Sequence, residues 1–396
     1  MNSQDVPACL QGVYTPGANG VPVDLAWHHG RFVPPGPGAH AEISLHGCLV
    51  TPGCIDVHCH GLEHWVFDRG REDALEISRR LPRYGVTSVF PTLIPQKGDA
   101  SLDRIRDVAL ALPDTEGARF PGLHLEGPFV ALGGAACWTT AGDLSLLSEL
   151  LSAAQNQVKI MSVSPDTANI LPVIEALVAA GVVPFITHTA ASVRQTLRAI
   201  DAGARHATHF YDVFPIPEQE EPGVRQAGAV EALLADPRCS ADFIADGVHV
   251  DPVVIRMALR ALGKEKVIAI TDSNLGAGLA DGVYPSAWGY DVRVDSRRGG
   301  VRVADENHPK QGALAGSALT MDRAMRNLRA WLPELSGREL WNLATRNPAV
   351  LTGLRDFGML EDGAVADFVA WDSTWRPVAA WVNGTCVYHR EVTTES

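Results

Sequence analysis

The stretch PGCIDVHCHG, residues 52–61, predicts a buried β-strand that ends in two histidines, His58 and His60. Side chains alternate between the two faces of a strand, so both imidazoles are expected on one face, close enough to bind the same cation. Gly61 follows and would leave that cation accessible to a substrate. Because neutral imidazole is the commonest metal ligand in proteins, the pair is a candidate catalytic metal site. A pair that is only solvated, or hydrogen-bonded in the core, is the alternative at this point.

Further polar residues end apolar stretches at the spacing of successive strand–helix units. In a parallel barrel the C-terminal ends of all strands gather at one rim, so residues distant in sequence meet there without a compact local motif. The candidates are Glu126, His188, His209, His249 and Asp272. Each of these residues, taken alone, is as well explained as a hydrogen-bonded polar residue at a strand end as it is as a metal ligand. Their recurrence favours a shared metal site.

The segments between these strands have helical periodicity. Apolar strands that alternate with amphipathic helices are typical of parallel βα units. The helical patterns cover residues 74–84, 102–112, 170–180, 193–202 and 252–262. Both ends of the chain instead contain short strands broken by proline and glycine turns. We therefore expect an α/β fold with a barrel over residues 52–358 and one small β domain made of residues 1–51 and 359–396.

Composition fits this architecture and excludes some partners. A chain of 396 residues that is 46% hydrophobic has room for a barrel of roughly 250 residues and a smaller unit. It has 33 basic and 46 acidic residues, a net charge of −13, so nucleic acid and anionic membranes are poor candidate partners. The N-terminus has no signal-like segment and no apolar run reaches the length of a membrane span. A cytoplasmic protein is expected.

The seven cysteines are scattered, with no C-x-x-C spacing. This distribution argues against a disulfide framework or a thiolate zinc site and favours reduced thiols. Cys59 lies between the two histidines, so on a strand its side chain should point to the opposite face. We expect Cys59 to pack in the core rather than bind metal.

Segments along nearly the whole chain resemble, in order and spacing, those of the amidohydrolase superfamily, and within it the N-acetylglucosamine-6-phosphate deacetylases. The matching segments are residues 52–58, 91–93, 123–129, 208–212, 245–251, 271–272, 314–321 and 344–349. The resemblance implies a (β/α)8 TIM barrel and a small β-sandwich domain formed by both termini. It also makes a homodimer the expected assembly.

The resemblance assigns six metal ligands. Glu126, His188 and His209 match the main ligands of the family, while His58 and His60 match the pair that, with Asp272, holds a second ion in two-metal members. One or two divalent metals per chain are therefore expected, with Glu126 as the bridging carboxylate when two are bound. Zinc suits this set of ligands, and Fe2+, Co2+ or Mn2+ remain open.

These residues support hydrolysis of an amide bond. A metal lowers the pKa of a bound water towards neutrality, and Asp272 would take the water's proton and pass it to the leaving amine. His249 matches a family residue that contacts substrate, so it would orient the substrate or polarise the scissile carbonyl. Asp272 and His249 are therefore the candidate catalytic residues.

The chain departs from the family where that family binds phosphate. The family pattern His-x-Tyr-Asn-Ala-Met-Pro is followed by Arg-Glu-Pro-Gly, whose arginine binds phosphate. Here Tyr211 is kept as a candidate substrate contact, Asp212 replaces the asparagine and Glu220 replaces the arginine. Two carboxylates would repel a phosphate dianion, which predicts a substrate without phosphate. A solvated Glu220, or replacement of the arginine by Arg225, is the alternative.

A second departure lies in the loop GGAACWT, residues 133–139. The family usually has a histidine here that contacts the substrate, whereas this chain has no histidine between His124 and His188. Trp138 falls at or near that position and offers a flat apolar surface, so it is a candidate substrate contact. A tryptophan that only packs the loop against the barrel is the other interpretation.

The sequence predicts a metal-dependent amidohydrolase that removes an acyl group, most simply acetyl, from a small amine or amino sugar lacking the 6-phosphate. N-acetylglucosamine-6-phosphate deacetylase itself is the main alternative. Another is a cyclic-amide hydrolase, deaminase or dipeptidase of the same superfamily, many of which bridge two metals with a modified lysine; Lys159 is the candidate. The last alternative is a non-enzymatic binding protein. The presence of all six ligand residues argues against this alternative.

Overall fold

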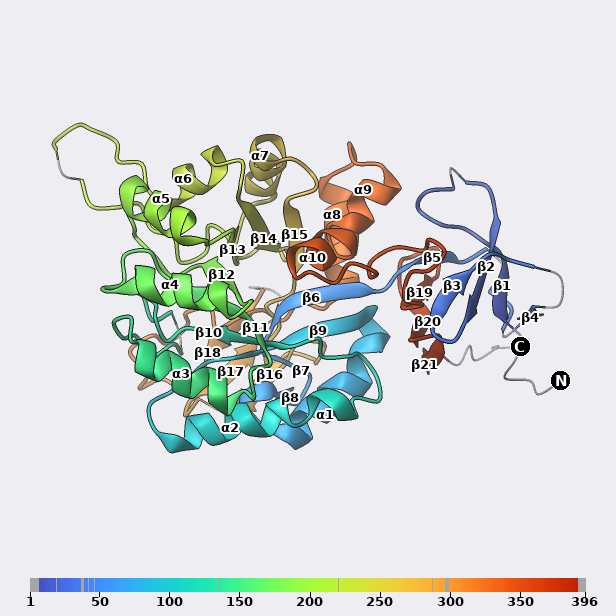
Figure 1. Cartoon of the computed structure of the whole chain (residues 1–396), viewed down its shortest axis with the longest axis horizontal. Helices are drawn as coiled ribbons and strands as arrows, with labels where there is room; N and C mark the ends of the chain where they lie inside the picture. Colours follow the sequence, from blue (N-terminus) through green and yellow to red (C-terminus); the bar gives the residue numbers. More distant parts are fainter. Residues whose placement is uncertain are drawn as a thin grey trace.

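The computed structural model describes residues 7–18, 20–36, 39–41, 43–45, 47–134, 136–219, 221–286, 288–295 and 299–390. An eight-stranded parallel sheet forms its centre (Figure 1). The strands are, in spatial order, β6 (Cys54–Cys59), β9 (Val86–Leu93), β10 (Leu123–Glu126), β11 (Val158–Val163), β12 (Val183–Ile186), β13 (His206–Ala207), β14 (Ser240–Ile244) and β15 (Val267–Ile270). The segment after β15 returns to β6, where the amide of Asp272 donates to the carbonyl of His58 at 2.9 Å. The sheet is therefore a nearly closed barrel, as predicted.

Helices cover the outside of the barrel. They are α1 (Arg71–Arg80), α2 (Asp99–Ala109), α3 (Leu144–Ala153), α4 (Ile170–Ala179), α5 (Val193–Ala202), α6 (Ala229–Ala235), α7 (Pro252–Leu262), α8 (Met321–Trp331), α9 (Gly337–Asn342) and α10 (Arg346–Leu351), with 3-10 turns at Phe67–Arg69, Leu81–Tyr84 and Leu112–Asp114. No helix in the described ranges is long and apolar enough to cross a membrane. All residues of β9 are buried, as expected of a strand enclosed on both faces.

The helix boundaries were predicted best where capping residues mark them. Ser192 accepts a hydrogen bond from the amide of Gln195, and Asp251 accepts one from Val253. The helices that follow these caps, α5 and α7, begin and end at the predicted residues. By contrast α1 and α2 each begin three residues before the predicted start, because a glycine precedes each and no side chain caps the helix.

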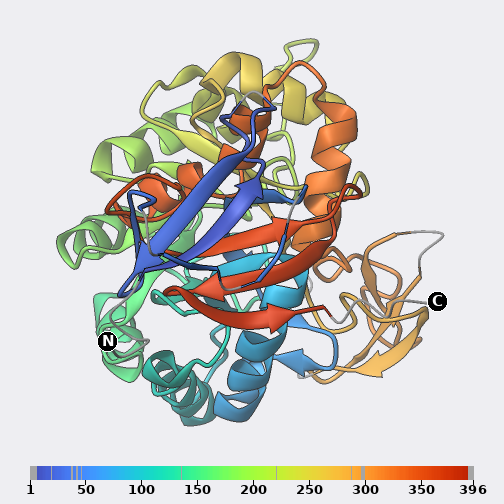
Figure 2. The same ribbon diagram turned by 90° about the vertical axis from the view of Figure 1, so that its right-hand side faces the viewer.

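Both chain ends build a separate β unit, as predicted (Figure 2). One sheet contains β1 (Ala8–Val13), β2 (Val23–His28), β3 (Arg31–Val33) and β4 (His40–Ala41); the other contains β5 (Leu49–Pro52), β19 (Phe368–Trp371), β20 (Pro377–Val382) and β21 (Thr385–His389). Aromatic rings from both sheets meet in its core: Phe368 stacks on Trp381 at 4.5 Å and contacts Trp27 at 4.9 Å, centroid to centroid. This packing joins the two sheets into a sandwich.

A small antiparallel sheet between β15 and α8 was not predicted. It contains β16 (Gly282–Pro285), β17 (Asp291–Val294) and β18 (Val301–Val303). Its apolar side chains form their own cluster with Val66 and Leu275, next to the hairpin of β7 (Gly61–Leu62) and β8 (Trp65–Val66). The insertion therefore packs beside the strand end that carries the two histidines.

One buried ion pair connects the barrel with the β unit. Arg119, just before β10, donates two hydrogen bonds to Asp367 at 2.8 and 2.9 Å, and Asp367 is 4% exposed.

Substitution Arg119→Met leaves the Asp367 carboxylate buried without its cation, so the free energy of unfolding should fall by about 3 kcal/mol in urea denaturation. Arg106→Met is the control, because its pair with Asp103 is exposed and should contribute less than about 1 kcal/mol. Equal losses in the two variants would contradict this assignment.

Candidate metal centre

The six predicted ligands meet at the C-terminal rim of the barrel. His58 lies in β6, His60 directly follows that strand and Glu126 is the last residue of β10. The other three, His188, His209 and Asp272, each lie two residues beyond the ends of β12, β13 and β15. All six residues are at most 6% exposed. Six ionisable groups thus share one buried site.

The strands end earlier than the sequence predicted, and the reason is backbone conformation. His188, His209 and Asp272 have φ angles of 49°, 35° and 46°. This left-handed region is unfavourable for residues other than glycine and costs about 1 kcal/mol or more each. Such conformations cluster at functional sites, where the surrounding structure holds them. Here each one interrupts a strand and directs a ligand into the rim.

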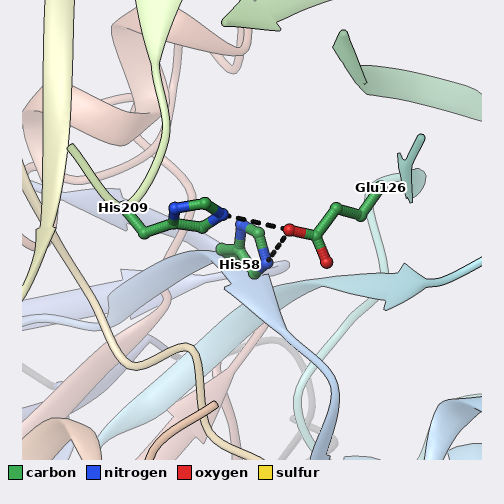
Figure 3. A group of neighbouring side chains, drawn as sticks. All are labelled: His58, Glu126 and His209. Atoms are coloured by element: carbon green, nitrogen blue, oxygen red, sulfur yellow. Dashed lines mark hydrogen bonds and ion pairs between the residues drawn. The ribbon is translucent and has the colours of Figure 1, made fainter. Parts of the chain in front are cut away.

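Glu126 is the central group of the site (Figure 3). Its Oε1 lies 3.1 Å from Nε2 of His188, 3.0 Å from Nε2 of His209 and 3.8 Å from Nε2 of His58. Its Oε2 lies 3.3 Å from Nε2 of His60. The two oxygens therefore face different histidines, which is the arrangement a bridging carboxylate requires.

His58 and His60 lie on one side of the chain, as strand alternation predicted. Their Nε2 atoms are 3.2 Å apart, and Oδ1 of Asp272 lies 3.6 and 3.3 Å from them. Cys59 points away and its Sγ lies 3.2 Å from Oγ of Ser273. The prediction that Cys59 packs in the core is therefore confirmed, and all seven cysteines are free thiols.

The donor set fits a divalent cation. Imidazole nitrogens and carboxylate oxygens converge here, and this donor set suits Zn2+ and related metals. Three overlapping sets have ligand atoms within 4.8 Å of one another: His58, Glu126 and His209; His58, His60 and Asp272; and Glu126, Cys137 and His188. The second set is the predicted second position. The predicted first position is divided between the other two, which share Glu126.

Hydrogen bonds fix the orientation of the ligands. Nδ1 of His188 donates to the carbonyl of Leu132 at 2.8 Å, which leaves Nε2 free of hydrogen. Nδ1 of His58 lies 2.9 Å from Oγ1 of Thr208, whose hydroxyl donates to Asp242 at 3.2 Å. His58 therefore donates through Nδ1 and also keeps Nε2 for a metal. The sequence carried no signal for these supporting groups.

The pKa values of these groups depend on their mutual contacts. Burial raises the pKa of Glu126, but the imidazoles of His58, His188 and His209 outweigh it and hold this pKa well below its ordinary value. Burial lowers the pKa of His58 well below its ordinary value. By contrast, Asp272 and Glu126 outweigh burial and raise the pKa of His60 well above its ordinary value, and Glu126 raises the pKa of His209 to about 10. A carboxylate anion and a neutral imidazole are the forms that bind metals, so a cation must displace the protons of His60 and His209.

A cavity of about 370 Å³ opens at this centre, and Asp212 and His249 line it. His249 lies five residues beyond the end of β14, on a loop rather than at the strand end that was predicted. Its Nδ1 is 2.7 Å from Oδ2 of Asp246. Burial lowers the pKa of His249, but Asp246 outweighs it and raises the pKa above its ordinary value. His249 is therefore favoured as a hydrogen-bond donor at the cavity wall.

Two predicted substrate contacts do not line the cavity. Tyr211 packs against Phe210, with ring centroids 4.8 Å apart. The Nζ of Lys97 lies over the ring of Trp138, 5.4 Å from the ring centroid. Cys137, the residue before Trp138, lines the cavity. The structure therefore gives these two substrate contacts no support, because loop residues, unlike strand residues, have no fixed alternation from which orientation follows.

The remaining predicted positions lie elsewhere. Glu220 is outside the described residues. Arg225, considered as a replacement for the family's arginine, has a side chain that is 79% exposed and pairs with Glu231 at 3.2 Å. Lys159 is exposed near the start of β11, at the barrel end away from the ligands. Lys159 therefore does not bridge metals.

Sequence reasoning missed several residues that line the cavity, among them Trp288, Tyr290, Lys310 and Cys137. The first three come from the inserted sheet and the loop after it. The paired aromatic residues of the stretch AWGY, residues 287–290, are the one signal that was available. Nothing in the sequence placed that stretch over the metal ligands.

Comparison with known proteins gives a consistent result. A profile of the Amidohydrolase family matches residues 49–389. The N-acetylglucosamine-6-phosphate deacetylase of Vibrio furnissii is 30% identical over 357 residues, 88% of this chain and 86% of that protein. The N-acetylgalactosamine-6-phosphate deacetylase of Escherichia coli O157:H7 is 30% identical over 85% of this chain and 87% of its own. A mutant N-acetyl-D-glucosamine-6-phosphate deacetylase from Mycobacterium smegmatis, solved in complex with N-acetyl-D-glucosamine-6-phosphate, superposes with a TM-score of 0.85 at 28% identity, covering 96% of this chain and 99% of that one.

The geometry predicts one or two divalent metals per chain in the purified protein, measured by elemental analysis. His188→Ala and His209→Ala should each lose at least one metal, because both contact Oε1 of Glu126. His64→Ala is the matched control, since His64 is exposed and outside the cavity. Fully active protein that stays metal-free after chelation would show that these residues do not form a catalytic metal site.

Proposed function

Because the chain belongs to the amidohydrolase family, we propose that it removes the acetyl group from the nitrogen of an N-acetylated amino sugar 6-phosphate. Such a chain is an enzyme that hydrolyses carbon–nitrogen bonds other than peptide bonds. One observation carries the proposal: five of the six ligands line one cavity, and His58 lies buried behind them, in a chain whose relatives are deacetylases. N-acetylglucosamine 6-phosphate is the first candidate substrate.

This proposal replaces the expected substrate without phosphate. The relatives named above are deacetylases of phosphorylated sugars. A substrate without phosphate was expected because Asp212 and Glu220 together would repel a phosphate dianion. Of these two residues, Asp212 is the one that the described structure shows at the cavity wall. Lys310 lines the same cavity and offsets one negative charge there. The phosphorylated alternative is therefore better supported.

The chain's own residues suit a two-position metal site. Glu126, His188 and His209 would hold one ion, and the second set described above would hold the other, with zinc as the first candidate. A divalent cation bound there would lower the pKa of a water molecule towards neutrality and polarise the acetyl carbonyl.

Asp272 would move the proton in the proposed reaction. Its carboxylate lies at the cavity wall beside His58 and His60, and its backbone is held by the amide of Ser317, which donates to its carbonyl at 2.7 Å. It would take a proton from the attacking water and transfer it to the leaving nitrogen, so that acetate and a free amine result. His249, whose Nδ1 is paired with Asp246, would donate to the substrate and orient it.

Other reactions of the superfamily have less support. The modified-lysine bridge of many cyclic-amide hydrolases and dipeptidases needs a lysine at the rim. Lys159 is exposed and away from the ligands, whereas the two oxygens of Glu126 face different histidines, so Glu126 would be the bridging carboxylate. A deacetylase with a glutamate bridge is thus the function that these residues favour.

A substrate comparison tests the proposal. Acetate release should be measured with N-acetylglucosamine 6-phosphate, N-acetylgalactosamine 6-phosphate and unphosphorylated N-acetylglucosamine. We expect kcat/KM of about 10⁴ M⁻¹s⁻¹ or more for one of the phosphates and at least about 10-fold less for the unphosphorylated sugar. A preference for the unphosphorylated sugar would overturn the proposed substrate class, and absence of deacetylation would overturn the reaction.

A second prediction concerns Asp272. Asp272→Asn keeps the shape of the side chain but removes its ability to accept a proton, so kcat should fall by about 10²-fold or more. Metal content is measured alongside, because Asp272 is also a candidate ligand. Asp103→Asn, an exposed position on α2, serves as the control. Near-normal turnover in Asp272→Asn with its metal retained would remove Asp272 from this role.

A further inference from the structure

Part of the cavity wall comes from the inserted sheet and the loop that follows it. Tyr290 directly precedes β17, and Lys310 lies in the loop after β18. Both line the cavity that also contains Glu126 and Asp272. Wall residues of this kind can contact the part of a substrate that lies away from its acetyl group.

Lys310 is the one lysine or arginine among the described residues that line the cavity. The acidic residues of the wall are Glu126, Asp212 and Asp272, and two of these are candidate metal ligands. Within the described ranges, the ammonium of Lys310 has no ion pair and no hydrogen bond. An unpaired cation at the wall of a catalytic cavity suits an anionic group of the substrate.

The backbone at Lys310 is held in place. Its amide donates to Nδ1 of His308 at 3.2 Å, and its carbonyl accepts from the amide of Ala313 at 3.0 Å. The loop is closed by Val303, whose amide donates to the carbonyl of Ala313 at 3.0 Å. The ammonium is therefore presented from an ordered turn rather than from a free chain end.

Tyr290 provides a second, independent sign of a ligand. It is 7% exposed, and its hydroxyl has no hydrogen-bond partner within the described part of the chain. Its ring contacts that of His308, with centroids 4.8 Å apart, so it lies next to the turn that carries Lys310. Burial raises the pKa of Tyr290 to about 12, so the hydroxyl stays protonated and available as a donor. A buried hydroxyl without a partner is destabilising unless a ligand satisfies it.

We propose that Lys310 and the hydroxyl of Tyr290 form the subsite that binds the phosphate group of the substrate. This inference rests on the proposed function and assigns phosphate recognition to residues of the insertion. It explains how the chain tolerates glutamate at position 220, where the family pattern has its phosphate-binding arginine. The ammonium supplies the charge, and the hydroxyl supplies a directed hydrogen bond.

The test compares Lys310→Met, Lys310→Arg, Tyr290→Phe and the control Lys159→Met on N-acetylglucosamine 6-phosphate and on N-acetylglucosamine. Lys310→Met should lower kcat/KM for the phosphate by about 10- to 100-fold, mainly through KM, because a hydrogen bond to a charged group is lost. Turnover of the unphosphorylated sugar should change by less than about 2-fold. Lys310→Arg should retain much of the preference, and Lys159→Met all of it.

Tyr290→Phe separates a binding role from a structural one. The substitution removes only the unpaired hydroxyl, so Tm should stay the same or rise while kcat/KM for the phosphate falls. Inorganic phosphate is a second probe: it should inhibit the wild-type protein competitively and Lys310→Met at least about 10-fold more weakly.

The outcomes distinguish the two proposals. A wild-type enzyme that prefers the 6-phosphate, but whose preference and phosphate inhibition ignore both substitutions, would contradict the subsite alone. Equal losses on both sugars in Lys310→Met and Tyr290→Phe would also contradict it, since they would indicate a structural role. A wild-type enzyme that prefers the unphosphorylated sugar would contradict the proposed substrate class itself.

Discussion

The contact between the Glu126 carboxylate and the histidines around it is the interaction on which the site depends. A carboxylate that is 4% exposed is costly unless several donors or cations satisfy it. Here His188 and His209 share one oxygen and His60 faces the other. None of these histidines is near Glu126 in sequence, so the site exists only when the barrel is formed.

Barrel closure is therefore both a folding requirement and a functional one. The hydrogen bond from the amide of Asp272 to the carbonyl of His58 joins the segment after β15 to β6 and also brings two candidate ligands together. The left-handed residues at the rim are tolerated because they follow strands whose interior is fully packed. Stability supplied by the core holds the ligands in conformations that their own backbone disfavours.

The electrostatics of the cavity explain why substrate recognition was the hardest property to predict. In the sequence, Asp212 and Glu220 replace the residues of the family pattern near the phosphate-binding position, which suggested that both carboxylates face the phosphate. In the folded chain, Asp212 lines the cavity and Lys310 lines it too, although nearly a hundred residues separate them in sequence. Local motifs show which charged residues a segment contains, whereas the net charge of a cavity wall depends on every segment that contributes to the wall.

The sequence by itself determined the barrel and the small β domain of the two chain ends, because strand periodicity, helix caps and turn residues are local signals. The six candidate metal ligands came from polar strand ends together with the resemblance to the amidohydrolase superfamily. The ends of α5 and α7 and the shared side of His58 and His60 followed from such signals. Only the tertiary structure decided which loop residues face the cavity. Trp138 turned away and the inserted sheet supplied Tyr290, because loop orientation is set by packing against distant segments rather than by any local period.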